Sequence, residues 1–562
     1  MSNPFFHISG TTKAGNPPPT PPWLGQGLRL DARSAQTHYA AAIALAKERK
    51  LDLAIEAYRK AALISPSCVR YHLALGQALH QSHRFREAAV SFGRVVEIWP
   101  ENLAALLLLG VALHKQGRLD DAIAIYAHVL RLSPGSAEAM TNLGTAYQDK
   151  GDTEAATRCQ RRAVELAPQM ASVHNNLGVA LLKGGRHHEA LKCYEQVLRV
   201  DPRHAGAHFN IGFAFQELGS YELAEKYYKR AMELKPGSDT LRFYMGTLHL
   251  LQGNFRAGWR EYEARWGSLH QRDSRRHFLQ PQWKGEPLAG QTILLHAEQG
   301  FGDTMQFIRY VPLVAALGAD VILEVQPRLK RLAEAIPGVR QVLAKGERLP
   351  DFQWQCPLLS LPLAFKTELE SIPNSVPYLN ASRTDQAAWG AKLRSPKFRI
   401  GLSWGGNPKH SQDAARSVPL MKLLELLRIP GAQFYSLQKG PPAKQLAELP
   451  EDISLINLDR AQHDFYDSAA IVANLDLVIS VDTSVAHLAG ALGRPLWVLL
   501  HHGSDWRWLL DRSDCPWYPA ARLFRKKQGE AWGALVDRVR SELVRLVEEH
   551  AGRTAQCFNA PR

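Results

Sequence analysis

Residues 169–202, QMASVHNNLGVALLKGGRHHEALKCYEQVLRVDP, show the pattern that decides the fold of the N-terminal half. The stretch closes on a proline, and proline recurs at a constant spacing of 34 residues. Proline cannot continue a helix, so a repeat of this length that closes on it is typical of a helix–turn–helix unit that stacks into a solenoid. The prolines in register are Pro66, Pro100, Pro134, Pro168, Pro202 and Pro236.

Three further positions keep the same register, and each has a physical role. Glycine and alanine let the two helices of a unit approach closely, and we expect the aromatic residue to fill the gap between neighbouring units. The glycines are Gly76, Gly110, Gly144, Gly178, Gly212 and Gly246, the alanines are Ala54, Ala88, Ala122, Ala156, Ala190 and Ala224, and the aromatics are Tyr58, Phe92, Tyr126, Tyr194 and Tyr228. Residues 35–268 resemble the tetratricopeptide-repeat family. We expect a superhelix of six full repeats, followed by a cap that begins near Asp239 and lacks the closing proline.

One asparagine position also repeats, at Asn142, Asn176 and Asn210. On stacked first helices these side chains would form a ladder along the concave face. Such amides can bind the backbone of an extended peptide, whereas the plain alternative is three solvated polar residues. Enzymes that glycosylate proteins and carry such repeats use a similar ladder, and the likeness suggests the same role here.

Composition bounds the rest of the chain. Its 562 residues leave room for about three or four domains of ~150 residues. No run of apolar residues is long enough to span a membrane, and the N-terminus lacks the pattern of a secretory signal. Six scattered cysteines without a Cys-x-x-Cys pair argue against a disulfide scaffold or a zinc site, so we expect a reducing, cytoplasmic location. The net charge of +14 allows an acidic partner, but we find no nucleic-acid-binding motif.

After Trp266 the pattern changes to alternating strands and helices, which predicts parallel sheets covered on both faces. We expect two such α/β domains with a cleft between them, at 292–385 and 396–550. Residues 269–291 resemble a linker, and 1–34 and 551–562 are expected to be tails, the first of them disordered. The strands are expected at 292–297, 320–325, 398–404, 433–437, 453–456, 475–481 and 495–500.

The first loop of interest follows the strand at 292–297 and contains Gly302 and Asp303. Glycines allow the backbone to approach a ligand, and free amides at a helix start favour anions. Asp303 would sit at the helix N-terminus, where plain capping is the alternative role.

The second loop follows the strand at 398–404 and contains Ser403, Gly405, Gly406 and Asn407. Two glycines flanked by polar side chains can hold a phosphate. An ordinary strand-to-helix turn explains the same residues equally well.

The third loop is the most specific of the three. Asp482, Thr483 and Ser484 follow a buried strand and open a helix, where hydroxyls and amides can cradle a phosphate. His487 lies one helical turn after Thr483, so it can face the same cleft. A structural role for this lone histidine is the alternative.

The stretch from Asp482 to Pro495, with Thr483, His487 and the run 491–493, resembles the donor-site motif of glycosyltransferase family 9, the heptosyltransferase-like enzymes. The loop at Gly302 is similar to the N-terminal loop of the same family. The resemblance implies a GT-B fold, two Rossmann-like halves that together span about 292–525. It departs from the family at Ser484, where glycine is common.

The resemblance also implies a role for each loop. Asp303 would be the catalytic base, and Thr483, Ser484 and His487 would contact the donor diphosphate. The expected reaction is inverting transfer of a sugar from a nucleotide sugar to a hydroxyl of a protein or glycan held by the repeats, without a metal or other cofactor. His296 and Glu298 are reserve candidates for the base.

Two other interpretations stay open. One is a non-catalytic adaptor whose second half is a degenerate or nucleotide-sensing domain. The other is a different GT-B chemistry, such as epimerisation of a nucleotide sugar. The segment 501–508 follows the last strong strand and contains two tryptophans, which would either stack on a ligand or pack in the core.

Overall fold

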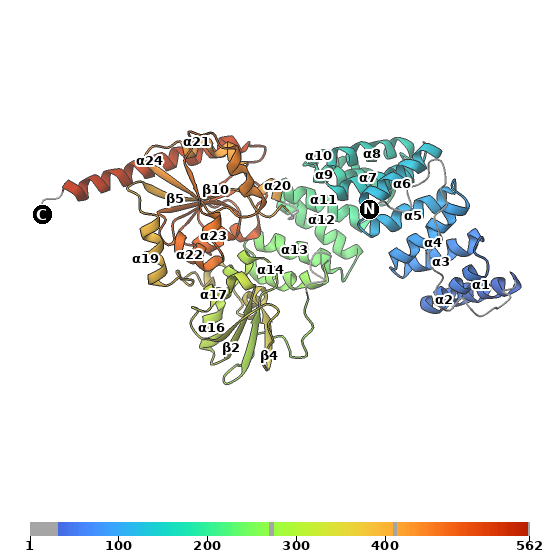
Figure 1. The fold of residues 1–562 in the computed structure, drawn as a ribbon, viewed down its shortest axis with the longest axis horizontal. Coiled ribbons are helices and arrows are strands. Elements are labelled where there is room, and N and C mark those ends of the chain that lie inside the picture. The colour runs from blue at the N-terminus through green and yellow to red at the C-terminus, as the bar shows by residue number, and fades with distance from the viewer. Residues whose placement is uncertain (1–31, 269–274, 409–412, 560–562) are drawn as a thin grey trace, which may run out of the picture. The chain divides into compact units, whose positions relative to one another are not determined.

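The computed structural model describes residues 32–268, 275–408 and 413–559 (Figure 1). The chain forms two compact units that divide between Ala214 and Phe215. The first unit consists of repeat helices, and the second contains the last repeat helices and two parallel sheets. The tail expected over 1–34 lies outside the described residues up to position 31, and the first helix begins at Ala32.

Each predicted repeat of the first unit forms two helices joined by a short turn, which confirms the tetratricopeptide-repeat pattern (Figure 1). All five of these turns contain a residue with a left-handed backbone, which glycine adopts without strain at Gly117, Gly151 and Gly185, while Arg49 and His83 adopt it in the first two repeats. The helices are α1 (Ala32–Lys47), α2 (Leu51–Ile64), α3 (Val69–Gln81), α4 (Phe85–Ile98), α5 (Leu103–Lys115), α6 (Leu119–Leu132), α7 (Ala137–Lys150), α8 (Thr153–Leu166), α9 (Ala171–Lys183), α10 (His187–Val200) and α11 (Ala205–Glu217), in which the division between the units falls.

The repeated glycine and aromatic pack directly against each other. A Cβ added at Gly76 would lie 2.5 Å from the Phe92 ring, and Gly178 stands in the same relation to Tyr194. Both partners belong to one repeat, on its first and second helices. The aromatic therefore packs on the glycine of its own unit.

The fourth repeat carries Gln160 in place of the aromatic. Its side chain is 1% exposed, and its Nε2 lies 2.6 Å from where a Cβ on Gly144 would stand. This Nε2 donates a hydrogen bond to the carbonyl of Thr141 at 2.9 Å, while the buried Oε1 has no partner among the described residues. The apolar core that begins at Ala35 runs through the first three repeats and α7 and ends at Ala146. A polar amide thus occupies the core position that an aromatic ring fills in the neighbouring repeats.

The second unit contains α12 (Tyr221–Leu234), α13 (Asp239–Leu251), α14 (Phe255–Tyr262) and the 3₁₀ turn Glu263–Gly267. The last two helices form the seventh repeat, whose aromatics continue into the core of the α/β part. The Trp259 ring lies 5.3 Å from Trp506 and 6.2 Å from Phe307, and its Nε1 donates a hydrogen bond to the carbonyl of Thr367. The seventh repeat and the α/β part therefore share one core.

Two parallel sheets make up the rest of the second unit (Figure 1). The first has the order β3-β2-β1-β4, and the second has the order β10-β9-β8-β5-β6-β7. In the second sheet the strand order reverses between β5 and β8, which is the position where open parallel sheets place their ligands. The strands are β1 (Thr292–His296), β2 (Asp320–Val325), β3 (Val339–Ala344), β4 (Trp354–Pro357), β5 (Phe398–Ser403), β6 (Ala432–Ser436), β7 (Leu455–Asn457), β8 (Leu477–Val481), β9 (Leu496–Leu500) and β10 (Ala521–Arg525).

The helices between the strands are mostly short. A 3₁₀ turn, Ile308–Tyr310, separates the first two helices after β1. The last helix runs over most of 551–562, the segment that we expected to be a tail. The α-helices are α15 (Phe301–Phe307), α16 (Val311–Ala316), α17 (Lys330–Ala333), α18 (Leu361–Ala364), α19 (Arg383–Lys392), α20 (Asp413–Arg416), α21 (Leu424–Leu427), α22 (Phe465–Val472), α23 (Ser484–Ala491) and α24 (Trp532–Asn559).

The segment that we expected to be a linker, 269–291, is partly built into the fold. Residues 269–274 lie outside the described residues, but Trp283 is 2% exposed and its backbone N–H donates to the carbonyl of Gln355. The segment therefore docks beside β4. Tryptophan has a large apolar side chain, so its removal from water stabilises the docked conformation of this segment.

Candidate functional site

The first and third loops meet where the two sheets face each other. A Cβ added at Gly302, in α15, would lie 2.6 Å from Cδ2 of His487, in α23. Because Gly302 has no side chain, the His487 ring can pack against its backbone. The glycine does not leave open space for a ligand. Close packing of α15 on α23 brings Asp303 near the carboxyl end of β8.

Asp303 has a partner at both carboxylate oxygens. Its Oδ2 accepts a hydrogen bond from the backbone N–H of Gly300 at 2.8 Å, which is the capping role that we considered as the alternative. Its Oδ1 forms an ion pair with Nη2 of Arg507, while the side chain stays 20% exposed. Asp303 is therefore oriented from two sides and still reaches solvent.

Arg507 connects two carboxylates. Besides Asp303 it holds Asp505, whose Oδ1 lies 2.7 Å from Nη1. Burial lowers the pKa of the guanidinium, but Asp505 and Asp303 outweigh it and raise the pKa above its usual value. Arg507 thus stays charged and lies between the two carboxylates. Sequence reasoning missed its role, although the Asp505-x-Arg507 spacing lies inside the segment 501–508.

His487 is enclosed by aromatic rings. It is 4% exposed, its Nδ1 lies 2.8 Å from the Tyr518 hydroxyl, and its ring stacks on Trp508 with centroids 5.4 Å apart. Burial, together with the charge of Arg507, lowers its pKa to about 3, so the imidazole is neutral at neutral pH. Trp508 packs against His487, so the packing role holds for this tryptophan.

Asp482 lies beside the histidine. Its Oδ1 is 3.9 Å from His487 Nε2, and the carboxylate is 16% exposed. Burial raises the pKa of Asp482, and the nearby charge of Asp505 adds to the effect, whereas Arg416 opposes it. A carboxyl group in these surroundings can hold a proton close to neutral pH.

Thr483 and Ser484 occupy the start of α23, as the sequence predicted. The Thr483 hydroxyl lies 3.0 Å from that of Ser480. The backbone N–H groups of Ser484 and Val485 have no hydrogen-bond partner among the described residues. Unpaired amides at a helix start favour an anion.

The backbone N–H groups of the second loop are bound by a side chain of the protein itself, Gln438. Oε1 of Gln438 accepts hydrogen bonds from the backbone N–H groups of Trp404 at 2.9 Å and Gly405 at 2.8 Å, and it lies 3.3 Å from the Ser403 hydroxyl. The groups that we expected to contact a donor phosphate are therefore held by Gln438 in this structure.

The far end of the second loop lies beside an ion pair. The backbone N–H of Gly406 donates to the Ser417 hydroxyl at 3.0 Å, and Asn407 is exposed. The space next to Gly406 is filled by Asp413 and Arg416, which pair with each other at 3.3 Å. Arg416 is the cation of this loop whose charge reaches Asp482.

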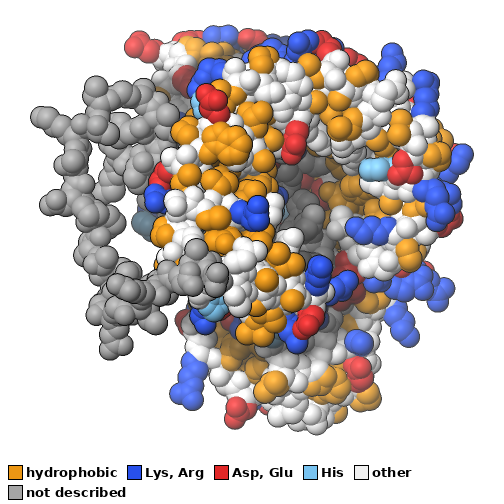
Figure 2. Space-filling view, turned by 90° about the vertical axis from the view of Figure 1, so that its right-hand side faces the viewer, with side chains coloured by type: hydrophobic (Ala, Val, Ile, Leu, Met, Phe, Trp, Pro, Cys, Tyr) orange, Lys and Arg blue, Asp and Glu red, His pale blue; other side chains and the backbone are white. Residues whose placement is uncertain are grey.

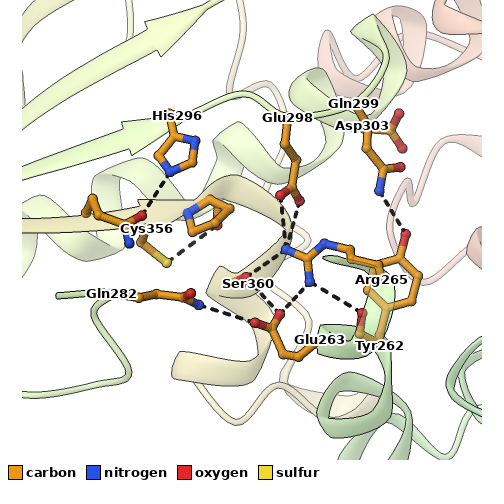
Figure 3. Close-up of polar contacts among 12 residues, drawn as sticks. Tyr262, Glu263, Arg265, Gln282, His296, Glu298, Gln299, Asp303, Cys356 and Ser360 are labelled. Atoms are coloured by element: carbon orange, nitrogen blue, oxygen red, sulfur yellow. Dashed lines mark hydrogen bonds and ion pairs between the residues drawn. The ribbon is translucent and has the colours of Figure 1, made fainter. Parts of the chain in front are cut away.

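The reserve candidates for the base lie in other surroundings (Figure 3). Glu298 is 1% exposed on its side chain, and both of its oxygens accept hydrogen bonds from Nη2 of Arg265. Arg265 also pairs with Glu263 at 2.5 Å and donates to the Ser360 hydroxyl. Burial raises the pKa of Glu298 to about 7. Glu298 is thus enclosed in a salt-bridge cluster and does not reach a substrate.

The predicted asparagine ladder lies on the first helices of repeats four to six. Asn142, Asn176 and Asn210 are half-buried on α7, α9 and α11, and α7 contacts α9. Asn175, which the sequence pattern missed, accepts a hydrogen bond from Asn210 at 3.2 Å and donates to Asn176 at 3.5 Å. Two members of the ladder are therefore linked through a fourth amide, and Asn142 has no partner among the described residues.

The surface and the helices add two observations. In the face shown in Figure 2, basic side chains are scattered among acidic and apolar ones and do not form a patch of one sign. No described helix combines the length and the apolar character needed to cross a membrane.

Comparison with known proteins bears mainly on the repeats. Residues 33–273 match a family model described as the C-terminal domain of cilia and flagella-associated protein 70. Protein FlbA of Caulobacter vibrioides is 28% identical over 330 residues, which cover 54% of this chain and 54% of FlbA. The chain thus spans about half the length of this curated relative.

Two solved structures are also similar. One is a MamA protein, with 28% identity, a TM-score of 0.27, and coverage of 30% of this chain and 91% of MamA. The other is a tetratricopeptide-repeat protein of Parabacteroides merdae, with 14% identity, a TM-score of 0.39, and coverage of 43% and 96%. From the family match and the helix pairs we conclude that the N-terminal part of the chain is a tetratricopeptide-repeat array.

Proposed function

We propose that the chain is a glycosyltransferase that moves a sugar from a nucleotide sugar to a hydroxyl of a protein or glycan held by its repeats. The observation that supports this most directly is the contact of Gly302 with His487, because it joins the loop of Asp303 to the helix that begins at Ser484. A carboxylate and unpaired helix amides are thereby held at the reversal of strand order in the second sheet.

In the proposed reaction Asp303 accepts the proton of the acceptor hydroxyl. The freed oxygen attacks the anomeric carbon from the face opposite the leaving group, the bond from that carbon to the diphosphate oxygen breaks, and the nucleoside diphosphate leaves with the electron pair. Negative charge on the diphosphate is stabilised by the amides of Ser484 and Val485, the Thr483 hydroxyl and the guanidinium of Arg507. These groups supply the stabilisation without a metal.

The test begins with binding. A panel of nucleotides and nucleotide sugars is screened by thermal shift on the wild type and on Thr483→Ala/Ser484→Pro, which removes the hydroxyl and one amide. A ligand at a hundred times its Kd adds about 2.7 kcal/mol of stability, enough to raise the Tm visibly. We expect one diphosphate family to stabilise the wild type and not the variant.

Turnover with the donor found in this way tests the base. Asp303→Asn keeps the hydrogen bond to Gly300 but cannot accept the proton, so we expect kcat to fall by about 10²–10⁴-fold while nucleotide binding remains. Asp351→Asn is the matched control, because Asp351 is exposed and outside the site. Wild-type turnover in Asp303→Asn would refute the assignment.

The adaptor interpretation has its own support. Gln438 holds the backbone amides of the second loop, and Arg507 holds Asp303, so the structure offers few groups ready for a donor. If no nucleotide stabilises the chain while the repeats still capture a partner protein, the adaptor is the function. Stabilisation and turnover together would exclude it.

A further inference from the structure

A polar pocket that does not include Asp303 lies at the carboxyl end of the first sheet. It encloses about 240 Å³, less than the ~300–1,000 Å³ of sites for drug-sized ligands, and so fits a small group. Residues from β1, β4 and the segment before them line it. Those that matter here are Arg275, Arg276, Phe278, His296 and Gln355.

His296 is the group in this pocket that lacks a partner. Its Nε2 lies 2.9 Å from Oε1 of Gln355, which can only accept, so Nε2 carries the proton and Nδ1 is an acceptor. The side chain is 4% exposed, and Nδ1 has no hydrogen-bond partner among the described residues. Burial lowers the pKa of His296 to about 4, so Nδ1 remains an unprotonated acceptor at neutral pH. A buried acceptor without a donor costs about 1–3 kcal/mol, unless a ligand supplies one.

Two arginines give the pocket its charge. Arg276 pairs with Glu324, which is 2% exposed, and its guanidinium lies over the Phe278 ring at 4.6 Å. The ring of Phe278 in turn packs on His296 with centroids 5.2 Å apart. Glu324 balances one positive charge, and the exposed Arg275 provides a second. The pocket therefore combines a net cation with a buried acceptor.

We propose that this pocket binds a small anion that brings its own hydrogen-bond donor, such as hydrogen phosphate or a phosphate monoester with a hydroxyl group. Arg275 and Arg276 attract the charge, and the donor of the anion satisfies Nδ1 of His296. The inference goes beyond the proposed transferase reaction and does not depend on it.

The probe is inorganic phosphate at pH 7.5. Its binding to the full chain is measured by the broadening of its ³¹P resonance. Hydrogen phosphate has an O–H to donate, whereas sulfate has the same shape and no proton. We expect the ³¹P line of phosphate to broaden in the presence of the chain. Equimolar sulfate should displace only a minor part of the bound phosphate. A narrow phosphate line, or equal displacement by sulfate, would overturn the proposal.

Variants locate the binding. His296→Phe keeps a ring that can pack on Phe278 but has no acceptor at the position of Nδ1, so phosphate affinity should fall about 3–10-fold and the preference over sulfate should vanish. Arg275→Gln should weaken both anions, while Arg328→Gln, an exposed arginine that does not line the pocket, should weaken neither. If His296→Phe does not fold by circular dichroism, Arg275→Gln and the sulfate competition decide. Unchanged affinity in Arg275→Gln would place the phosphate elsewhere and refute the pocket.

Discussion

Arg265 and Arg507 each hold two carboxylates, but they do so in different surroundings. The side chain of Arg265 is fully buried, and its partner Glu298 is 1% exposed. The partners of Arg507 reach solvent, with Asp303 20% and Asp505 36% exposed. The other partner of Arg265, Glu263, is 23% exposed. One carboxylate of the first cluster is thus enclosed by protein, whereas both carboxylates of the second cluster reach solvent.

The comparison separates a structural cluster from one that can take part in binding. Removing one partner from a closed cluster leaves an uncompensated buried charge, which is strongly destabilising. When the carboxylates reach water, removing the arginine destabilises the fold less, because water solvates their charge. An arginine between such carboxylates can exchange one of them for a phosphate of a ligand. The Arg265 cluster therefore fixes the seventh repeat to the first sheet, and the Arg507 cluster is available for chemistry.

Arg265→Met should have the largest effect, because it leaves the enclosed carboxylate of Glu298 without a cation. We expect a loss of about 3–5 kcal/mol in the second unit. Urea unfolding followed by tryptophan fluorescence reports on this unit, since of the thirteen tryptophans only Trp23 and Trp99 precede it. Arg328→Met is the control, and a midpoint equal to that of the control would show that the two clusters do not differ in this way.

The second prediction concerns pH. The folded-state pKa of Glu298 is raised from 4.5 to about 7, so the folded chain binds the proton more tightly than the unfolded chain. The stabilisation is complete below pH 4.5 and is lost as the pH rises through about 7, by about 3 kcal/mol. Glu298→Gln does not titrate at this position. The stability of the wild type relative to the variant should therefore fall as the pH rises through this window. A difference independent of pH would mean that Glu298 stays ionised throughout.

The smallest effect is expected for Arg507→Met. Water can reach both Asp303 and Asp505, so the loss of stability should be about 1–3 kcal/mol and below that of Arg265→Met in the same urea experiment. The variant should also weaken any nucleoside diphosphate that stabilises the wild type. A loss of stability as large as that of Arg265→Met would make the Arg507 cluster structural as well.

The repeats and most strands could be predicted from sequence, because their signals are periodic. The constant spacing of the prolines located every helix pair, and alternating apolar runs located β1, β2 and β5 within a residue or two. The strands β3, β4 and β10 were missed. Val339–Ala344 has a half-exposed pattern with Arg340 and Gln341, and Trp354–Pro357 is short and ends in proline, so neither stands out as a buried run.

The candidate site was predictable only in part. The motif residues at Asp303 and Thr483 lie where a loop follows a strand, and that placement can be derived from local pattern. The partners of these loops cannot be derived from local pattern, because Arg507 is 204 residues from Asp303 and Gln438 is 34 residues from Trp404. Only the folded chain shows that a glutamine closes one loop and an arginine holds the carboxylate of another.

Gln160 has a consequence for how the repeat array unfolds. In a linear array each repeat touches only its neighbours, so cooperativity spreads only as far as the interfaces between them are strong. The buried apolar cluster that begins at Ala35 ends at Ala146 in α7, and Gln160 of α8 packs against this helix in place of a ring. We expect this polar contact to make the fourth repeat less stable than its neighbours. Amide hydrogen exchange around Gly144 should therefore be faster than around Gly110.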